Sequence, residues 1–138
     1  MRFIPEAVYE EVTTNEEFQD EAEQIRQSDF LKVVSIDDEK AISILQRVAG
    51  LDRGESEAII YADENRTDYL LMDEVPGRKA ATDMGLRIMG SIGVITNAAK
   101  DVHINVAEAE MAFEKIRNSN RHISEKIIMD ALAIIRNE

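Results

Sequence analysis

The alternation of short apolar segments with longer amphipathic segments is the feature that most constrains the fold of this chain. Phe30–Ile36 is rich in β-branched residues and is bounded by polar residues, which is typical of a strand. The next segment has apolar side chains at helical spacing, at positions 41, 42, 45, 48 and 49, and Gly50 ends it. Strands that alternate with helices predict an α/β fold with a mainly parallel sheet and helices on both faces.

Applied to the whole chain, this reasoning predicts a sheet of about four strands. The expected strands are Met1–Ile4, Phe30–Ile36, Asp68–Met72 and Leu86–Met89. Helices are expected from Pro5, over Asn15–Ser28, after a cap at Asp37, and over Gly54–Asn65, Pro76–Gly85 and Ser91–Lys100. Two more are expected to begin near Asn105 and Ser124. In the helix Asn15–Ser28, Phe18 is expected on the inner face. In the last helix, an apolar stripe is predicted at positions 127, 128, 131, 132 and 135.

A chain of 138 residues predicts one domain, residues 1–138, with a helical tail from about residue 102. The tail has two interpretations, as a cover for the core or as a dimerisation element. The apolar runs are much shorter than a membrane span, and the chain has no cysteines, so a disulfide framework and a thiolate metal site are excluded. These features predict a cytoplasmic protein without a membrane partner.

The formal net charge of −12 bears on the choice of partners. An acidic surface repels a polyanion, and the sequence has no cluster of Lys or Arg of the kind that non-specific nucleic-acid binders carry. The acid excess has two interpretations. It serves solubility, or some of the acids surround a divalent cation or face a basic partner.

Three carboxylates from three elements are candidates for such a cation site. Helical spacing places Glu11 on one face with Ala7, Val8 and Val12, and Glu55 on the inner stripe of the helix after Gly54, where Glu57 does not fall.

Asp73 follows the apolar run Tyr69–Met72, at the edge where open α/β sheets place their sites. Mg²⁺ and Mn²⁺ prefer carboxylate oxygens, so Glu11, Glu55 and Asp73 form a candidate metal site.

Each acid also has a structural interpretation. In that interpretation Glu11 is solvated at a frayed helix end, and Glu55 favours the positive N-terminus of its helix. Asp73 then either caps the helix that begins near Pro76 or forms a turn. Arg78 and Lys79, close to Asp73 in the sequence, are candidates for contact with a substrate phosphate, or they form a solvated helix face.

The sequence resembles the PIN domains. The run Ile4–Val12 is similar to their second strand and the helix after it. Leu51–Ile59, followed by Leu70–Glu74 and Gly77–Ala81, resembles an uncharacterised prokaryotic subfamily related to VapC-type toxins. Gly85–Val94 matches the next strand and a glycine-flanked turn of that subfamily.

The resemblance implies a Mg- or Mn-dependent ribonuclease that cleaves RNA. It also implies that the protein could be the toxin of a toxin–antitoxin pair. It places Glu11, Glu55 and Asp73 at the acidic site positions, with Glu74 as an auxiliary acid.

PIN domains begin with a strand that ends in an aspartate, and this sequence starts at the second strand. Three interpretations follow: the start codon was assigned late, the gene is decayed, or the sheet is truncated and a second copy or an antitoxin-like protein completes it. The alternative function is a catalytically inactive PIN-like module for binding or oligomerisation.

Overall fold

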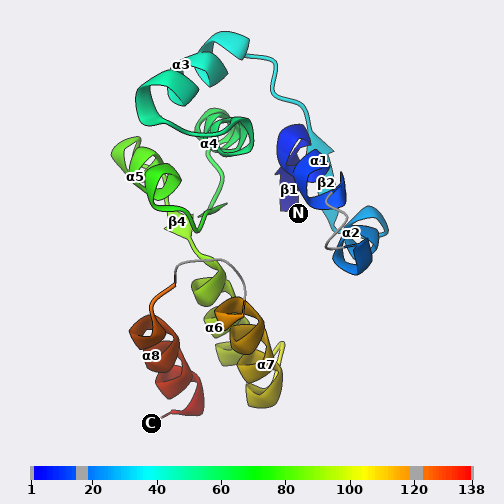
Figure 1. The fold of residues 1–138 in the computed structure, drawn as a ribbon, viewed down its shortest axis with the longest axis vertical. Helices are drawn as coiled ribbons and strands as arrows, with labels where there is room; N and C mark the ends of the chain where they lie inside the picture. The colour runs from blue at the N-terminus through cyan, green and yellow to red at the C-terminus, as the bar shows by residue number, and fades with distance from the viewer. Residues whose placement is uncertain (1, 15–18, 119–122, 138) are drawn as a thin grey trace. The chain divides into compact units, whose positions relative to one another are not determined.

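The computed structural model describes residues 2–14, 19–118 and 123–137 of the chain (Figure 1). The predicted cap at Asn15, together with Phe18, lies outside the described residues. Internal contacts divide the chain into two compact units, Met1–Ile88 and Met89–Glu138, and each is described by itself. The single domain remains a prediction, because a division by contacts does not show whether the units fold separately.

The first unit contains most of the predicted elements in the predicted order. Its elements are β1 (Arg2–Pro5), α1 (Glu6–Thr14), α2 (Gln19–Arg26), β2 (Leu31–Val34), α3 (Glu39–Ala49), α4 (Arg53–Asn65), β3 (Leu70–Leu71) and α5 (Val75–Asp83), and its last residue, Ile88, begins β4 (Ile88–Met89). The mixed α/β class is thereby confirmed. Strands β2, β3 and β4 are shorter than the sequence predicts, whereas β1 has the four residues expected and includes Pro5, so α1 begins at Glu6 rather than at the predicted Pro5.

The strands of the described residues form two two-stranded sheets rather than the predicted sheet of about four strands. β1 and β2 are parallel, with Arg2 opposite Leu31 and Pro5 opposite Val34. β3 pairs with β4, and the Leu70 N–H donates to the Arg87 carbonyl at 2.8 Å. Strands β3 and β4 have two residues each, so they offer too few backbone groups for a longer ladder. The sequence prediction of one sheet failed because an apolar run indicates a strand but does not fix which strand it pairs with.

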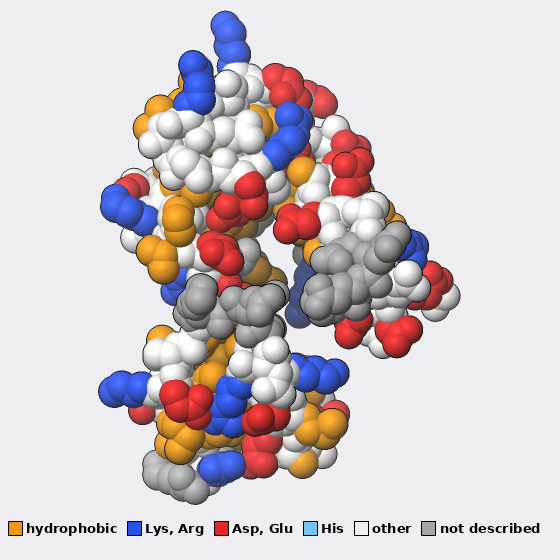
Figure 2. All heavy atoms as spheres, viewed as in Figure 1, with side chains coloured by type: hydrophobic (Ala, Val, Ile, Leu, Met, Phe, Trp, Pro, Cys, Tyr) orange, Lys and Arg blue, Asp and Glu red, His pale blue; other side chains and the backbone are white. Residues whose placement is uncertain are grey.

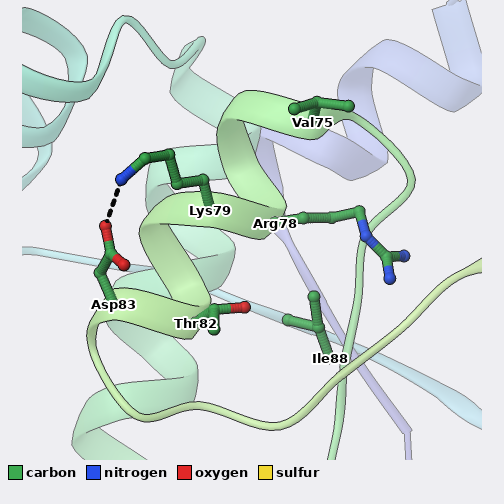
Figure 3. Close-up of a pocket in the computed structure, with 6 residues that line it drawn as sticks. All are labelled: Val75, Arg78, Lys79, Thr82, Asp83 and Ile88. Carbon is green, nitrogen blue, oxygen red and sulfur yellow. Dashed lines mark hydrogen bonds and ion pairs between the residues drawn. The ribbon is translucent and has the colours of Figure 1, made fainter.

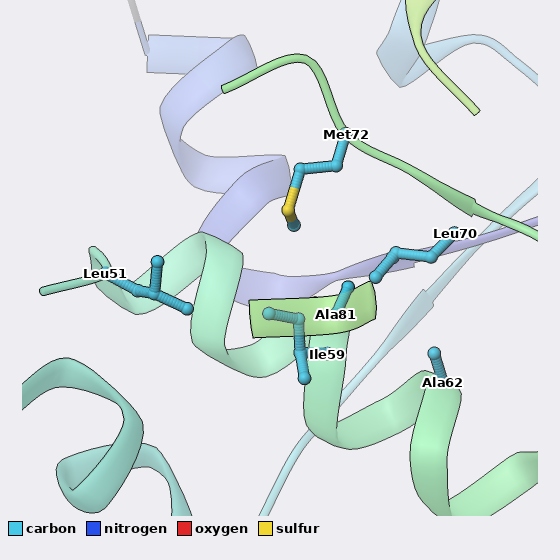
Figure 4. Close-up of a cluster of buried hydrophobic side chains, with 6 residues drawn as sticks. All are labelled: Leu51, Ile59, Ala62, Leu70, Met72 and Ala81. Carbon is cyan, nitrogen blue, oxygen red and sulfur yellow. The ribbon is translucent and has the colours of Figure 1, made fainter. Parts of the chain in front are cut away.

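Helix α4 is the centre of the first unit and contacts α1, α3, α5, β1 and β3. On α4, Ile59 is fully buried and Ala62 nearly so, and they pack with apolar side chains from other elements (Figure 4). Full burial of a side chain such as Ile59 stabilises the fold by roughly 1.5–3 kcal/mol. The complete cluster is Leu51, Ile59, Ala62, Leu70, Met72 and Ala81.

The ends of α3 illustrate how local chemistry sets helix bounds. Asp38, rather than the predicted Asp37, is the N-cap, and its side chain accepts from the Ala41 N–H at 3.1 Å. Asp37 lies one residue too early for its carboxylate to serve the first turn. Gly50 ends α3 in the left-handed conformation, as predicted.

In the second unit, the described residues form three helices, α6 (Ser91–Lys100), α7 (Val106–Arg117) and α8 (Glu125–Arg136), around the fully buried Phe113. The predicted caps Asn105 and Ser124 are confirmed, because both side chains accept backbone N–H bonds. The predicted stripe on α8 needs one correction. Ile127 is 52% exposed, since the inner face turns toward residues 128, 131 and 132.

In the described parts of the chain, no helix has both the length and the apolar character needed to cross a bilayer.

Val102, between α6 and α7, has a strained backbone. Its φ is +62°, a left-handed conformation that costs a β-branched residue roughly 1–2 kcal/mol. The side chain is 84% exposed, so it contributes little packing in return.

We expect Val102→Gly to raise the free energy of unfolding by about 1 kcal/mol, because glycine adopts this conformation without the steric cost. Urea unfolding of the full chain measures the change. The matched control is Val48→Gly, an equally exposed valine inside α3, which should lose a few tenths of a kcal/mol. Equal destabilisation of both variants would contradict the strain.

Candidate carboxylate site

Glu55, in the first turn of α4, uses its two carboxylate oxygens differently. Oε1 accepts from the Asp52 N–H at 3.2 Å, and Asp52 Oδ1 accepts from the Glu55 N–H at 2.8 Å, so the two residues form a capping box. Oε2 is buried and has no hydrogen-bond partner among the described residues. The structural interpretation, a helix N-terminal role, therefore accounts for one oxygen and leaves the other unexplained.

The surroundings of Glu55 disfavour its charged form. Burial raises its pKa above the ordinary value of 4.5, and the negative charges of Asp52 and Glu74 raise it further, while the hydrogen bond from the Asp52 backbone lowers it. A buried, unpaired carboxylate oxygen next to other acids is a place where a cation is stabilising.

Glu11 reaches the same region from α1. The sequence predicts an apolar face for Glu11, and this is corrected, because the residue as a whole is exposed. In α1 the buried residue is Thr13, and residues two positions apart along a helix point to nearly opposite sides, so Glu11 turns away from the buried side. Glu11 Oε2 and Asp52 Oδ1 nevertheless each lie 3.6 Å from the point that a Cβ on Gly54 would occupy. Two acids therefore lie at the first turn of α4, next to Glu55.

Asp73 connects two residues that lie near Glu55. Met72, before it, packs against Gly77 beside Glu55 Oε2, and Glu74, after it, is close enough to raise the pKa of Glu55. Asp73 itself is partly buried. The interpretation of Asp73 as the cap of α5 is wrong, because the N-cap residue is Glu74. The Glu74 side chain makes no capping hydrogen bond.

Gly77 allows α5 to approach α4 at this site. A Cβ at this position would lie 2.7 Å from Glu55 Oε2 and 2.2 Å from Met72 Sδ, both much closer than real contacts allow. The buried Gly77 therefore brings the first turn of α5 against the Glu55 carboxylate, and Glu74, the residue before α5, is close enough to affect its pKa.

The chemistry of these side chains fits a hard divalent cation, and their spacing fits less well. All the donors are carboxylate oxygens, the ligands that Mg²⁺ and Mn²⁺ prefer, and Glu55 Oε2 lacks a partner in the described residues. Within residues 2–14, 19–118 and 123–137, however, no three His, Cys, Asp or Glu side chains lie close enough together to hold one ion. The structure places Glu11 and Glu55 beside the same turn, without assembling a complete set of ligands.

Glu57 is a residue of this region that sequence reasoning placed wrongly. The helical stripe predicts an outward position, yet Glu57 is 3% exposed, because the start of α1 and the side chain of Arg53 cover it. The signal available in the sequence was the four-residue spacing from Arg53, which places the two side chains on one helix face.

Arg78 and Lys79 are neighbours on α5, and their side chains point in different directions (Figure 3). Arg78 Nη1 donates to the Met72 carbonyl at 3.0 Å, and Lys79 pairs with Asp83 at 2.8 Å. They line a shallow pocket of about 400 Å³ together with Val75, Thr82, Asp83 and Ile88. The pocket therefore contains two cationic side chains. Arg78 is held by the carbonyl of Met72, the residue before Asp73, and the charge of Lys79 is offset by Asp83.

The described Lys and Arg side chains stand separately on the face drawn in Figure 2, among groups of Asp and Glu side chains. This pattern matches the net charge of −12. An RNA strand at the surface seen here would meet a mainly repulsive field, which isolated cations and a bound metal ion would weaken locally.

The fold and the carboxylates describe a small α/β protein with an acidic site around the first turn of a central helix. The profile of the family described as PIN domain matches residues 1–137, so the chain belongs to the PIN domain family. This confirms the resemblance at the level of the family and assigns the chain a nuclease-type fold. No curated protein and no solved structure matches the chain.

We expect Gly77→Ala to destabilise the protein by about 1–3 kcal/mol, the usual cost of overpacking. The added Cβ would overlap Met72 Sδ and Glu55 Oε2. Urea unfolding measures the change. Gly93→Ala in α6 is the control. Its added Cβ would meet Met89 Cγ at 3.0 Å, on a flexible side chain that can shift, so we expect little change or a gain. Equal stability of Gly77→Ala and the wild type would argue against the close approach of α5.

Glu55→Gln should make stability less dependent on pH. Because the pKa of Glu55 is raised in the folded state, its contribution is full below the unfolded value and is lost as pH rises through the folded pKa. The wild type should therefore lose stability relative to Glu55→Gln as the pH rises above the ordinary value of 4.5, without added metal. Urea unfolding across this range measures the difference. Glu64→Gln, at the exposed end of α4, should follow the wild type.

Proposed function

We propose that this protein is a metal-dependent endoribonuclease, in which Glu11, Glu55 and Asp73 hold Mg²⁺ or Mn²⁺ and Glu74 is an auxiliary acid. The observation that carries the proposal is Glu55 Oε2, which is buried, lacks a described partner and lies near the charges of Asp52 and Glu74. Membership of the PIN domain family supports the same chemistry. When bound, the metal ion supplies Lewis-acid polarisation of a water and offsets charge on the phosphodiester.

The residues of the chain have separate tasks in this proposal. The acids bind the cation, and without it they repel RNA phosphates, so substrate binding and catalysis both depend on metal. Arg78 contacts a phosphate beside the site, with its guanidinium already oriented by the Met72 carbonyl, and Lys79 adds a weaker contact because Asp83 shares its charge.

The biological form that we propose is the toxin of a toxin–antitoxin pair. Its partner is an antitoxin-like protein, or a second copy of the chain, that adds an extended segment to a sheet edge. The short sheets support this, since β1 and β2 pair with each other and a two-stranded sheet has two outer edges.

The test is hydrolysis of single-stranded RNA with Mn²⁺ or Mg²⁺ and with excess chelator. We expect chelator to abolish cleavage. Glu11→Gln, Glu55→Gln and Asp73→Asn should each reduce kcat/KM by more than the roughly 10- to 100-fold typical of changes outside the ligand set. Glu64→Gln is the matched control and should cleave like the wild type. Cleavage that persists in excess chelator would end the proposal.

The second candidate function is a catalytically inactive PIN-like module that binds a partner or a second copy. The observation that favours it is the lack, in the described parts of the chain, of three acidic or histidine side chains close enough for one ion. Titration with Mn²⁺ separates the two functions. A nuclease takes up Mn²⁺ and loses the uptake in Glu55→Gln, whereas an inactive module shows the same weak binding in both proteins.

A further inference from the structure

Glu57 is almost completely buried, and its negative charge is accounted for by two partners. Its side chain is 4% exposed. Oε1 accepts from the Ala7 N–H at 3.2 Å, and Oε2 accepts from Arg53 Nε at 2.8 Å. A carboxylate buried to this extent is stabilised only when both its charge and its hydrogen bonds are satisfied. The two contacts satisfy both requirements.

The bond to Ala7 fixes the beginning of α1. Ala7 is the second residue of that helix, where backbone N–H groups have no acceptor within the helix. Glu57 supplies the acceptor from another helix, and its negative charge also favours the positive end of the α1 dipole. The contact therefore joins α1 to α4 at one defined point.

Arg53 extends the connection to α3. Its guanidinium donates to both carboxylate oxygens of Glu39, at 3.0 and 2.5 Å, as well as to Glu57. These bonds raise the pKa of Arg53 and lower that of Glu39, as expected for charged partners. A bidentate pair of this kind fixes orientation more firmly than a single contact does.

The connection involves the same two helices, α1 and α4, as the carboxylate site. Ala7 and Glu11 are four residues apart on α1, so they lie on the same face, one turn from each other. On α4, Glu57 is three residues after Gly54, the residue against which Glu11 Oε2 and Val8 pack. A fixed position at Ala7 thus determines where Glu11 meets the first turn of α4.

We propose that Glu57, held by Arg53, is a positioning residue that places Glu11 beside Glu55 for metal binding. The inference rests on the proposed function for its metal. It assigns Glu57 a role distinct from that of the site acids, because its two oxygens already bind Ala7 and Arg53. Arg53 also offsets the charge of Glu57, which would otherwise add to the repulsion among the acids nearby.

The experiment measures Mn²⁺ binding to the full chain by calorimetry, with Glu57→Ala, Glu57→Asp and the control Asn105→Ala. We expect Glu57→Ala to weaken Mn²⁺ binding by about tenfold, as for other residues that support metal ligands. Glu57→Asp keeps the charge near Arg53, but the shorter side chain withdraws from Ala7, so it should also weaken binding. Asn105→Ala removes an N-terminal acceptor from α7 in the second unit and should leave Mn²⁺ affinity unchanged.

Two further measurements separate positioning from general stability. In a Glu11→Gln background, Glu57→Ala should have no further effect on Mn²⁺ affinity, because Glu57 acts through Glu11. Hydrogen exchange of the Ala7 amide, measured by NMR without metal, should become faster in Glu57→Ala and Glu57→Asp and stay unchanged in Asn105→Ala. An additive loss in the double variant would overturn the positioning role.

The possible failures have different signatures. A wild-type chain that takes up no Mn²⁺ overturns the proposed function, while the Ala7 exchange still reports whether Glu57 fixes α1. Equal Mn²⁺ affinity in the wild type and a folded Glu57→Asp overturns the positioning role and leaves the proposed function standing. If Glu57→Ala does not fold, Glu57→Asp alone decides.

Discussion

The close approach of two helices to α4 is the constraint on which the rest of the first unit depends. At Gly54, α1 comes so near that an added Cβ would meet Val8 Cγ2 at 3.0 Å, and at Gly77, α5 comes near enough to crowd Glu55. Because neither glycine has a side chain, backbones and carboxylates meet where other residues would hold them apart. The same approach that buries Ile59 and its neighbours therefore also gathers acids.

Gathering acids costs free energy, and the structure offsets this cost in different ways at neighbouring positions. Glu57 is paired with Arg53 and with the start of α1, so its charge is balanced within the protein. Asp52 and one oxygen of Glu55 bind the backbone at the start of α4. The second oxygen of Glu55 has no such partner among the described residues, and burial raises its pKa. Of these carboxylates, Glu55 is the one whose charged form a bound cation would stabilise most.

Much of the local structure could be predicted from the sequence, and the candidate site only in part. The caps Asn105 and Ser124 and the end of α3 at Gly50 follow from residue type, because capping is decided within a few residues. Glu55 was found through its helical position. The buried Glu57 was missed, since its burial depends on α1, a helix some fifty residues earlier in the chain. Pairing of β3 with β4 was likewise beyond the apolar pattern, which gives strand character and not partners.

The sequence by itself determined the α/β class, the order of the elements, the acidic character and the likeness to PIN domains, because these depend on residue type, short-range spacing and composition. Only the tertiary structure decided that the described strands form two small sheets, that Glu57 is inside, and that one oxygen of Glu55 is left without a described partner. Burial and charge pairing are properties of contacts between distant segments. A helical wheel or an alternating pattern describes one segment at a time, so it cannot contain them.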